Sequence, residues 1–62
     1  MMYHLMFYYV DGDTAQAQEE DIYEAKLWAL EALKEIPELD RVNIFEEEED
    51  FTLGKMVGFY TR

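Results

Sequence analysis

Apolar and aromatic side chains fill the start of the chain at both odd and even positions. Residues 2–10 read Met-Tyr-His-Leu-Met-Phe-Tyr-Tyr-Val and carry no fixed charge at neutral pH. The run is about half as long as a membrane-spanning helix, and the turn sequence Asp11-Gly12-Asp13 follows it. We therefore expect a strand that is buried on both faces and that the rest of the chain must cover or extend.

A helical pattern follows and predicts one helix over residues 14–36. Asp13 with Gln16 three residues later is typical of a capping box at its start, and Pro37 ends it. Trp28 lies outside the main apolar stripe, where it either covers the sheet edge or anchors an interface. The predicted buried stripe is Ile22, Ala25, Ala29, Leu33 and Ile36, and a flanking apolar strip is Tyr23, Leu27 and Leu30.

Alternating positions predict two further strands, over residues 39–45 and 55–61. The five consecutive carboxylates at 46–50 are expected mostly in the turn between them, because like charges are hard to place in a paired ladder. Gly58, inside the last strand, indicates a bulge or a close backbone approach.

These elements predict one α+β domain over residues 1–62. We expect a βαββ unit, half of a ferredoxin-like fold, with a three-stranded sheet of order 1-3-2 and the helix on one face. The first two strands should be parallel to each other, and the last two should form an antiparallel hairpin. The outer edge of the first strand and the other sheet face would stay uncovered. The side chains expected toward the helix are Leu5, Phe7, Val42, Ile44, Val57 and Phe59. Those expected on the uncovered face, and so at an oligomer interface, are His4, Met6, Tyr8, Phe45, Met56 and Tyr60.

Charge adds a constraint on partners, because fifteen acidic and five basic residues give a net charge of −10. Half of the residues are hydrophobic, so the charge belongs to a folded protein rather than to a disordered tail. The sign argues against direct binding of nucleic acid and against anionic membranes. No basic residue precedes the apolar run and no cleavage site follows it, so we expect a cytoplasmic protein.

The chain offers little material for catalysis or for binding a cofactor. Cys and Ser are absent, and His4 is the only imidazole. The stretch that begins at Asp11 fails as a calcium loop, because Ala15, Gln16 and Ile22 occupy positions that need an oxygen ligand, a glycine and a glutamate. We therefore predict that the protein is not an enzyme and that it has no metal and no cofactor.

Two sets of acidic residues remain as candidates for binding a partner. One set lies within about 60° on the predicted helix and comprises Glu20, Glu24, Glu31 and Glu35. The other is the predicted turn, which comprises Glu46, Glu47, Glu48, Glu49 and Asp50.

We predict a small acidic protein-interaction module, in its sharpest form an inhibitor that blocks a basic, nucleic-acid-binding protein by mimicking DNA or RNA. In general type it resembles the short, acidic, Cys-free inhibitors carried by phages and mobile elements. The alternative is a structural or assembly protein that forms a homodimer or larger oligomer through the sheet edge and the uncovered face. A chain of 62 residues without disulfides has a small core, and association would add to it.

Overall fold

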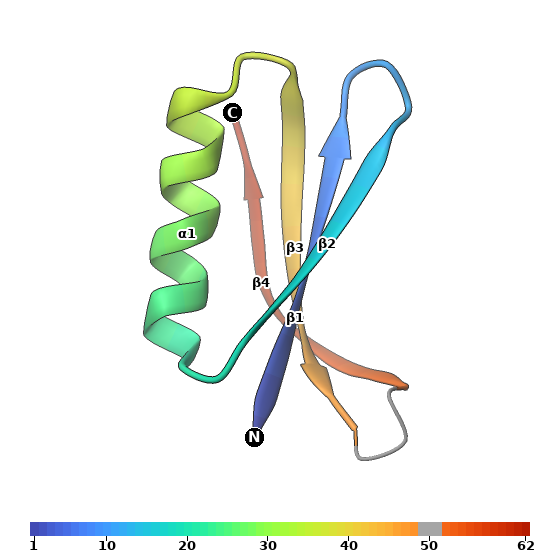
Figure 1. Ribbon diagram of the computed structural model, residues 1–62, viewed down its shortest axis with the longest axis vertical. Coiled ribbons are helices and arrows are strands. Elements are labelled where there is room, and N and C mark those ends of the chain that lie inside the picture. The colour runs from blue at the N-terminus through green and yellow to red at the C-terminus, as the bar shows by residue number, and fades with distance from the viewer. Residues whose placement is uncertain (49–51) are drawn as a thin grey trace.

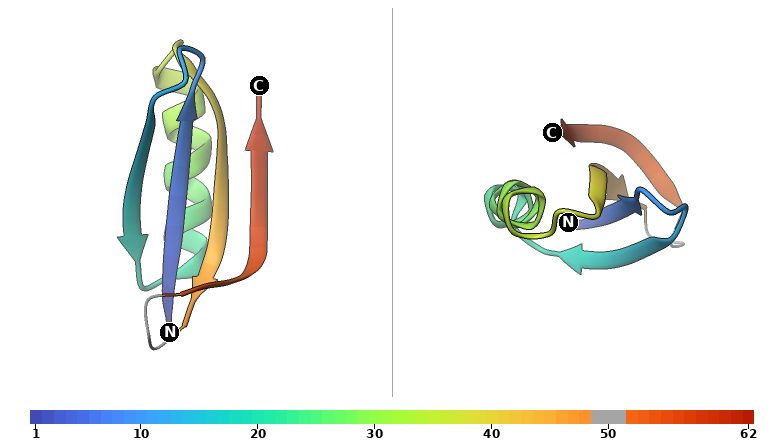
Figure 2. Two further views of the ribbon diagram at one scale, coloured as in Figure 1. Left: turned by 90° about the vertical axis from the view of Figure 1, so that its right-hand side faces the viewer. Right: turned by 90° about the horizontal axis from the view of Figure 1, so that it is seen from above.

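The computed structural model describes residues 1–48 and 52–62, and it shows an α+β fold of two layers. The elements are β1 (Met2–Tyr9), β2 (Thr14–Glu19), α1 (Ile22–Glu35), β3 (Leu39–Glu47) and β4 (Leu53–Thr61) (Figure 1). The four strands form one antiparallel sheet of order β2-β1-β3-β4, and α1 lies against one of its faces (Figure 2). No helix in the described ranges is long and apolar enough to cross a membrane.

Residues 14–19, expected in the helix, instead form β2. In the register with β1, Ala15 lies opposite Phe7 and Ala17 lies opposite Leu5. Alanine and glutamine favour helices, but their strict alternation here also suits a strand with one apolar side. The unpaired edge of β1 favours the strand, because pairing with β2 satisfies the backbone groups of this apolar strand and covers an edge that would otherwise be open to other chains.

The predicted sheet order is wrong, and so is the predicted parallel direction of the strands at 2–10 and 39–45, whereas the antiparallel hairpin of the last two strands is confirmed. β1 runs antiparallel to both β2 and β3 and lies between them, so β2 and β3 point the same way and α1 connects them across β1. The sequence predicts that the helix connects the first strand to the strand at 39–45. In the structure the helix starts from β2 instead and leads to β3. The edge of β1 is therefore occupied and offers no oligomer contact, and the free edges belong to β2 and β4.

The helix begins eight residues later than the sequence predicts. Its N-cap is Asp21, whose side chain accepts a hydrogen bond from the backbone N–H of Tyr23 at 2.8 Å. The expected capping box of Asp13 and Gln16 is wrong, because Asp13 closes the β1–β2 turn and Gln16 lies in β2. The end of the helix before Pro37 is confirmed.

The core lies between α1 and the two central strands. The buried alanines of α1 let the helix approach the sheet closely, and the predicted helix stripe is confirmed, with Ile22 and Ile36 partly buried at its ends. The buried apolar residues are Leu5, Phe7, Ala25, Ala29, Ala32, Leu33, Leu39, Val42 and Ile44.

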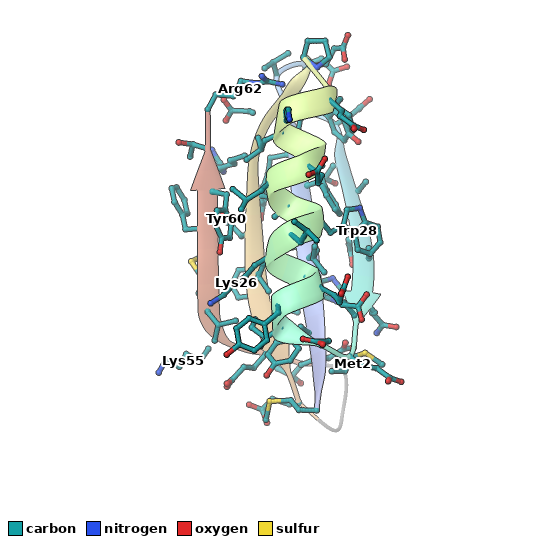
Figure 3. The ribbon with its side chains drawn as sticks, turned by 90° about the vertical axis from the view of Figure 1, so that its left-hand side faces the viewer. Met2, Lys26, Trp28, Lys55, Tyr60 and Arg62 are labelled. Atoms are coloured by element: carbon teal, nitrogen blue, oxygen red, sulfur yellow. The ribbon has the colours of Figure 1, made fainter. Side chains whose placement is uncertain are left out.

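In β4, Phe59 and Tyr60 lie on the sheet faces opposite to those that the sequence predicts. Its register against β3 shifts between the pair of Ile44 with Gly58 and the pair of Phe45 with Met56, so a bulge interrupts the alternation. Tyr60 consequently packs against the core from the helix side of β4 (Figure 3), and Phe59 faces away, 59% exposed. Both assignments from strict alternation were wrong, whereas the bulge indicated by Gly58 is confirmed.

Arg62 joins the end of β4 to the end of the helix. Its Nε donates to the backbone carbonyl of Leu39 at 2.9 Å, and a second guanidinium nitrogen donates to the carbonyl of Ile36 (Figure 3). Because these bonds satisfy carbonyls beside the helix C-terminus, we expect Arg62→Ala to lower the free energy of unfolding by about 1–2 kcal/mol. Urea denaturation measures this loss. An unchanged transition midpoint would show that the guanidinium adds nothing to stability.

Candidate protein-interaction surfaces

The outer face of α1 exposes large apolar side chains. Tyr23, Leu27 and Leu30 are 77%, 53% and 52% exposed, and we call these three residues the apolar stripe. They stand at positions i, i+4 and i+7, which lie in one line along a helix. The sequence places this strip beside the buried face, and the structure shows that the sheet leaves it uncovered.

Three carboxylates follow one side of the apolar stripe. Glu24, Glu31 and Glu35 are exposed and lie within about 40° of one another around the helix, and we call them the acidic border. None of the three forms an ion pair within the described ranges. Glu20, predicted with them, lies in the turn before α1 and not on the helix. The acidic border therefore carries three unpaired negative charges on one helix face.

Trp28 packs on the sheet rather than standing free. Its ring lies 5.9 Å from the ring of Phe7, with the two planes at 56°, and Figure 3 shows it on the β2 side of α1. This geometry is a tilted aromatic pair. Of the two interpretations from the sequence, covering of the sheet is the one that the structure shows.

The run of carboxylates at 46–50 is not one acidic turn. Glu46 and Glu47 belong to β3, where their ladder partners are the uncharged residues Tyr3, Met2 and Leu53. The side chain of Glu47 is only 5% exposed, and both of its oxygens accept from Gln18 Nε2 at 2.8 Å. Glu48 is exposed, whereas Glu49 and Asp50 lie outside the described residues. In the described part of the run, Glu48 is therefore the one fully exposed residue, Glu46 is half-buried in β3, and Glu47 is bonded to Gln18.

We use the name open sheet face for the side of the sheet away from α1 (Figure 2). The register places five of the six predicted interface residues there, with Phe59 in place of Tyr60. At one end of the face, the Arg41 guanidinium lies 4.5 Å from the centroid of the Tyr8 ring. The residues of this face include His4, Met6, Tyr8, Asn43, Phe45, Met56 and Phe59.

A cluster of polar side chains from β1, β2 and β3 lies on the same face. His4 Nε2 donates to Gln16 Oε1 at 2.8 Å, and His4 Nδ1 lies 3.9 Å from a Glu47 oxygen. His4 Nδ1 and Asn43 Oδ1 are buried and have no hydrogen-bond partner in the part of the chain that the structure describes. Gln16 and Gln18 reach this group because residues 14–19 form β2, a placement that the alternation of alanine with polar residues could have indicated.

Comparisons with known proteins add no identity to these surfaces. No protein-family model, curated protein or solved structure matched the chain. Among residues 1–48 and 52–62, no three His, Asp or Glu side chains gather where they could hold a metal ion. The outer face of α1 and the open sheet face are therefore the candidate interaction surfaces.

Proposed function

We propose that the protein is a small acidic interaction module that binds a basic protein partner through the outer face of α1. The observation that supports this most directly is the acidic border, three exposed carboxylates that form no ion pair within the described residues, next to an exposed apolar stripe. A helix that presents apolar anchors at i, i+4 and i+7 is suited to a groove on another protein. The carboxylates select a groove whose rim carries Lys or Arg, because opposite charges speed association and reject other partners.

The sharpest form of this proposal is inhibition by nucleic-acid mimicry. The acidic border spaces its charges by about 10 Å and then about 6 Å along the helix axis, and Lys or Arg side chains that bind phosphates are long enough to adapt to such spacings. The net charge of −10 gives the whole protein the field of a polyanion. A nucleic-acid-binding protein that received α1 in its basic groove would be blocked.

Charge reversal on α1 tests the proposal. Glu24→Lys with Glu31→Lys should weaken partner binding at least tenfold, because two attractive contacts become repulsive. The buried alanines of α1 are untouched, so the circular dichroism spectrum should be retained. Immobilised protein incubated with lysate of the natural host at low and at high salt provides the measurement, with the captured protein identified and its affinity determined by titration.

A second pair of charge reversals serves as the matched control. Asp13→Lys with Glu38→Lys changes the net charge by the same amount at two exposed positions outside α1 and outside both acidic sets, and it should leave the affinity within about twofold. Equal losses from both pairs would mean that net charge alone attracts the partner. Mimicry further requires that DNA or RNA compete with the protein, and formation of a ternary complex would exclude it.

A further inference from the structure

The acidic side chains avoid one face of this molecule. Among the ladder-paired residues that face away from α1, Glu47 alone has a carboxylate, and it is already bonded to Gln18. Residues 52–62 contain no Asp or Glu at all, although one residue in four of the whole chain is acidic. Two copies with a net charge of −10 each can therefore meet on the open sheet face with the least electrostatic repulsion.

The same face exposes apolar side chains. Phe59 and Met56 are 59% and 43% exposed, and Met6, Tyr8 and Phe45 lie half-buried beside them on the neighbouring strands. Exposed apolar side chains that gather on one face of a small protein indicate a contact surface.

Two buried polar atoms on this face have no hydrogen-bond partner among residues 1–48 and 52–62. They are Oδ1 of Asn43, a residue that is 8% exposed, and His4 Nδ1. A buried polar group without a partner is unfavourable, and a second chain on this face can supply donors where contact moves aside the side chains that cover these atoms. This observation is independent of the distribution of charge.

We infer that the open sheet face is the interface of a two-fold homodimer of this chain. The two sheets pack back to back, and each α1 remains on the outside, so one dimer presents two copies of the acidic border. Contact through α1 is disfavoured for a second copy, because an antiparallel pair of these helices sets Glu24, Glu31 and Glu35 against the same residues of its partner. The dimer does not depend on the partner proposed above, and failure of either proposal leaves the other standing.

The size of the face indicates how tight this dimer is. Four strands spaced about 4.8 Å apart, with about eight residues each at 3.3 Å, give roughly 500 Å² per copy and 1,000 Å² for the pair. This value lies at the low end for specific interfaces, so we expect reversible association at micromolar concentrations. The experiment must therefore cover concentrations from about 5 to 500 µM.

Light scattering coupled to gel filtration tests the interface. The mass should rise from 7.4 kDa toward twice that value as concentration increases. Met56→Glu with Phe59→Glu places two charges on the face at exposed positions and should weaken the dimer at least tenfold without loss of fold. Tyr23→Glu with Leu30→Glu makes the same kind of change on α1 and should leave the dimer intact.

Distance measurement between spin labels distinguishes the possible arrangements. The chain has no Cys, so Lys34→Cys carries a single label on the outer side of α1. Back-to-back sheets about 10 Å apart, each with a helix about 10 Å behind it, separate the two helix axes by about 30 Å, whereas helices in contact lie 8–10 Å apart. A distance of 30 Å or more supports the inference. A main distance below about 20 Å, a monomer at 500 µM, or a dimer unaffected by the Met56 and Phe59 changes would overturn it.

Discussion

Leu5→Ala is expected to remove about 2–5 kcal/mol from the free energy of unfolding. Leu5 is 0% exposed at the middle of β1, where Ala17 and Ile44 flank it on the two neighbouring strands. A 62-residue chain at ordinary stability per residue has only about 3–9 kcal/mol in total. The substitution should therefore remove most of the stability and leave a substantial unfolded fraction at 37 °C.

Leu30→Ala is the matched control for this experiment. It deletes the same atoms from a side chain that is 52% exposed on α1, so its cost should stay below about 0.5 kcal/mol. Urea denaturation of both variants at one protein concentration provides the comparison. Equal losses would mean that the outer face of α1 is buried in solution and that the described core is incomplete.

Gly58→Ala is expected to cost about 1–3 kcal/mol because the new methyl group has no space. A Cβ at this position would lie 3.0 Å from the Tyr60 ring and 3.1 Å from Ile44 Cδ1. Both neighbours belong to or pack against the core, so neither can move away freely. Thermal and urea unfolding of the variant measure the loss.

Ile44→Val identifies the cause of that loss, because valine lacks the Cδ1 atom that the new methyl group meets. In this background Gly58→Ala should cost at least 0.5 kcal/mol less than in the wild type. Gly12→Ala is the contrasting variant, since a Cβ there meets nothing within 4 Å but the backbone has a φ of 95°. Its cost of about 1–2 kcal/mol comes from backbone strain and should be the same in both backgrounds. Additive behaviour at Gly58 would rule out the steric contact with Ile44.

The two proposed surfaces lie on opposite sides of the molecule. The acidic border is on the outer side of α1, whereas the open sheet face is behind the sheet that α1 covers (Figures 2 and 3). Substitutions on one surface therefore leave the other intact, and the double variants of Glu24 with Glu31 and of Met56 with Phe59 can be interpreted independently. If both proposals hold, each dimer binds two partners, or one symmetric partner with increased avidity.

The sequence by itself determined the elements that several local signals indicate together. The length of residues 2–10 and the turn sequence after them favoured a strand, Pro37 ends the helix, and small residues at helical spacing predicted the buried side of α1. The uncovered sheet face followed as well, because one helix covers only one side of a sheet. The net charge of −10 required no structure.

Only the tertiary structure decided how those elements combine. Residues 14–19 have helix-forming composition with strand-like alternation, and they became β2 because β1 needed a partner for its edge. That choice shortened the helix, changed the sheet order and brought Gln18 to Glu47, so this carboxylate of the run is bonded within the chain. Phe59 and Tyr60 changed places because the bulge beside Gly58 shifts the alternation by one residue. Local propensity cannot settle these points, since long-range strand pairing stabilises the final arrangement.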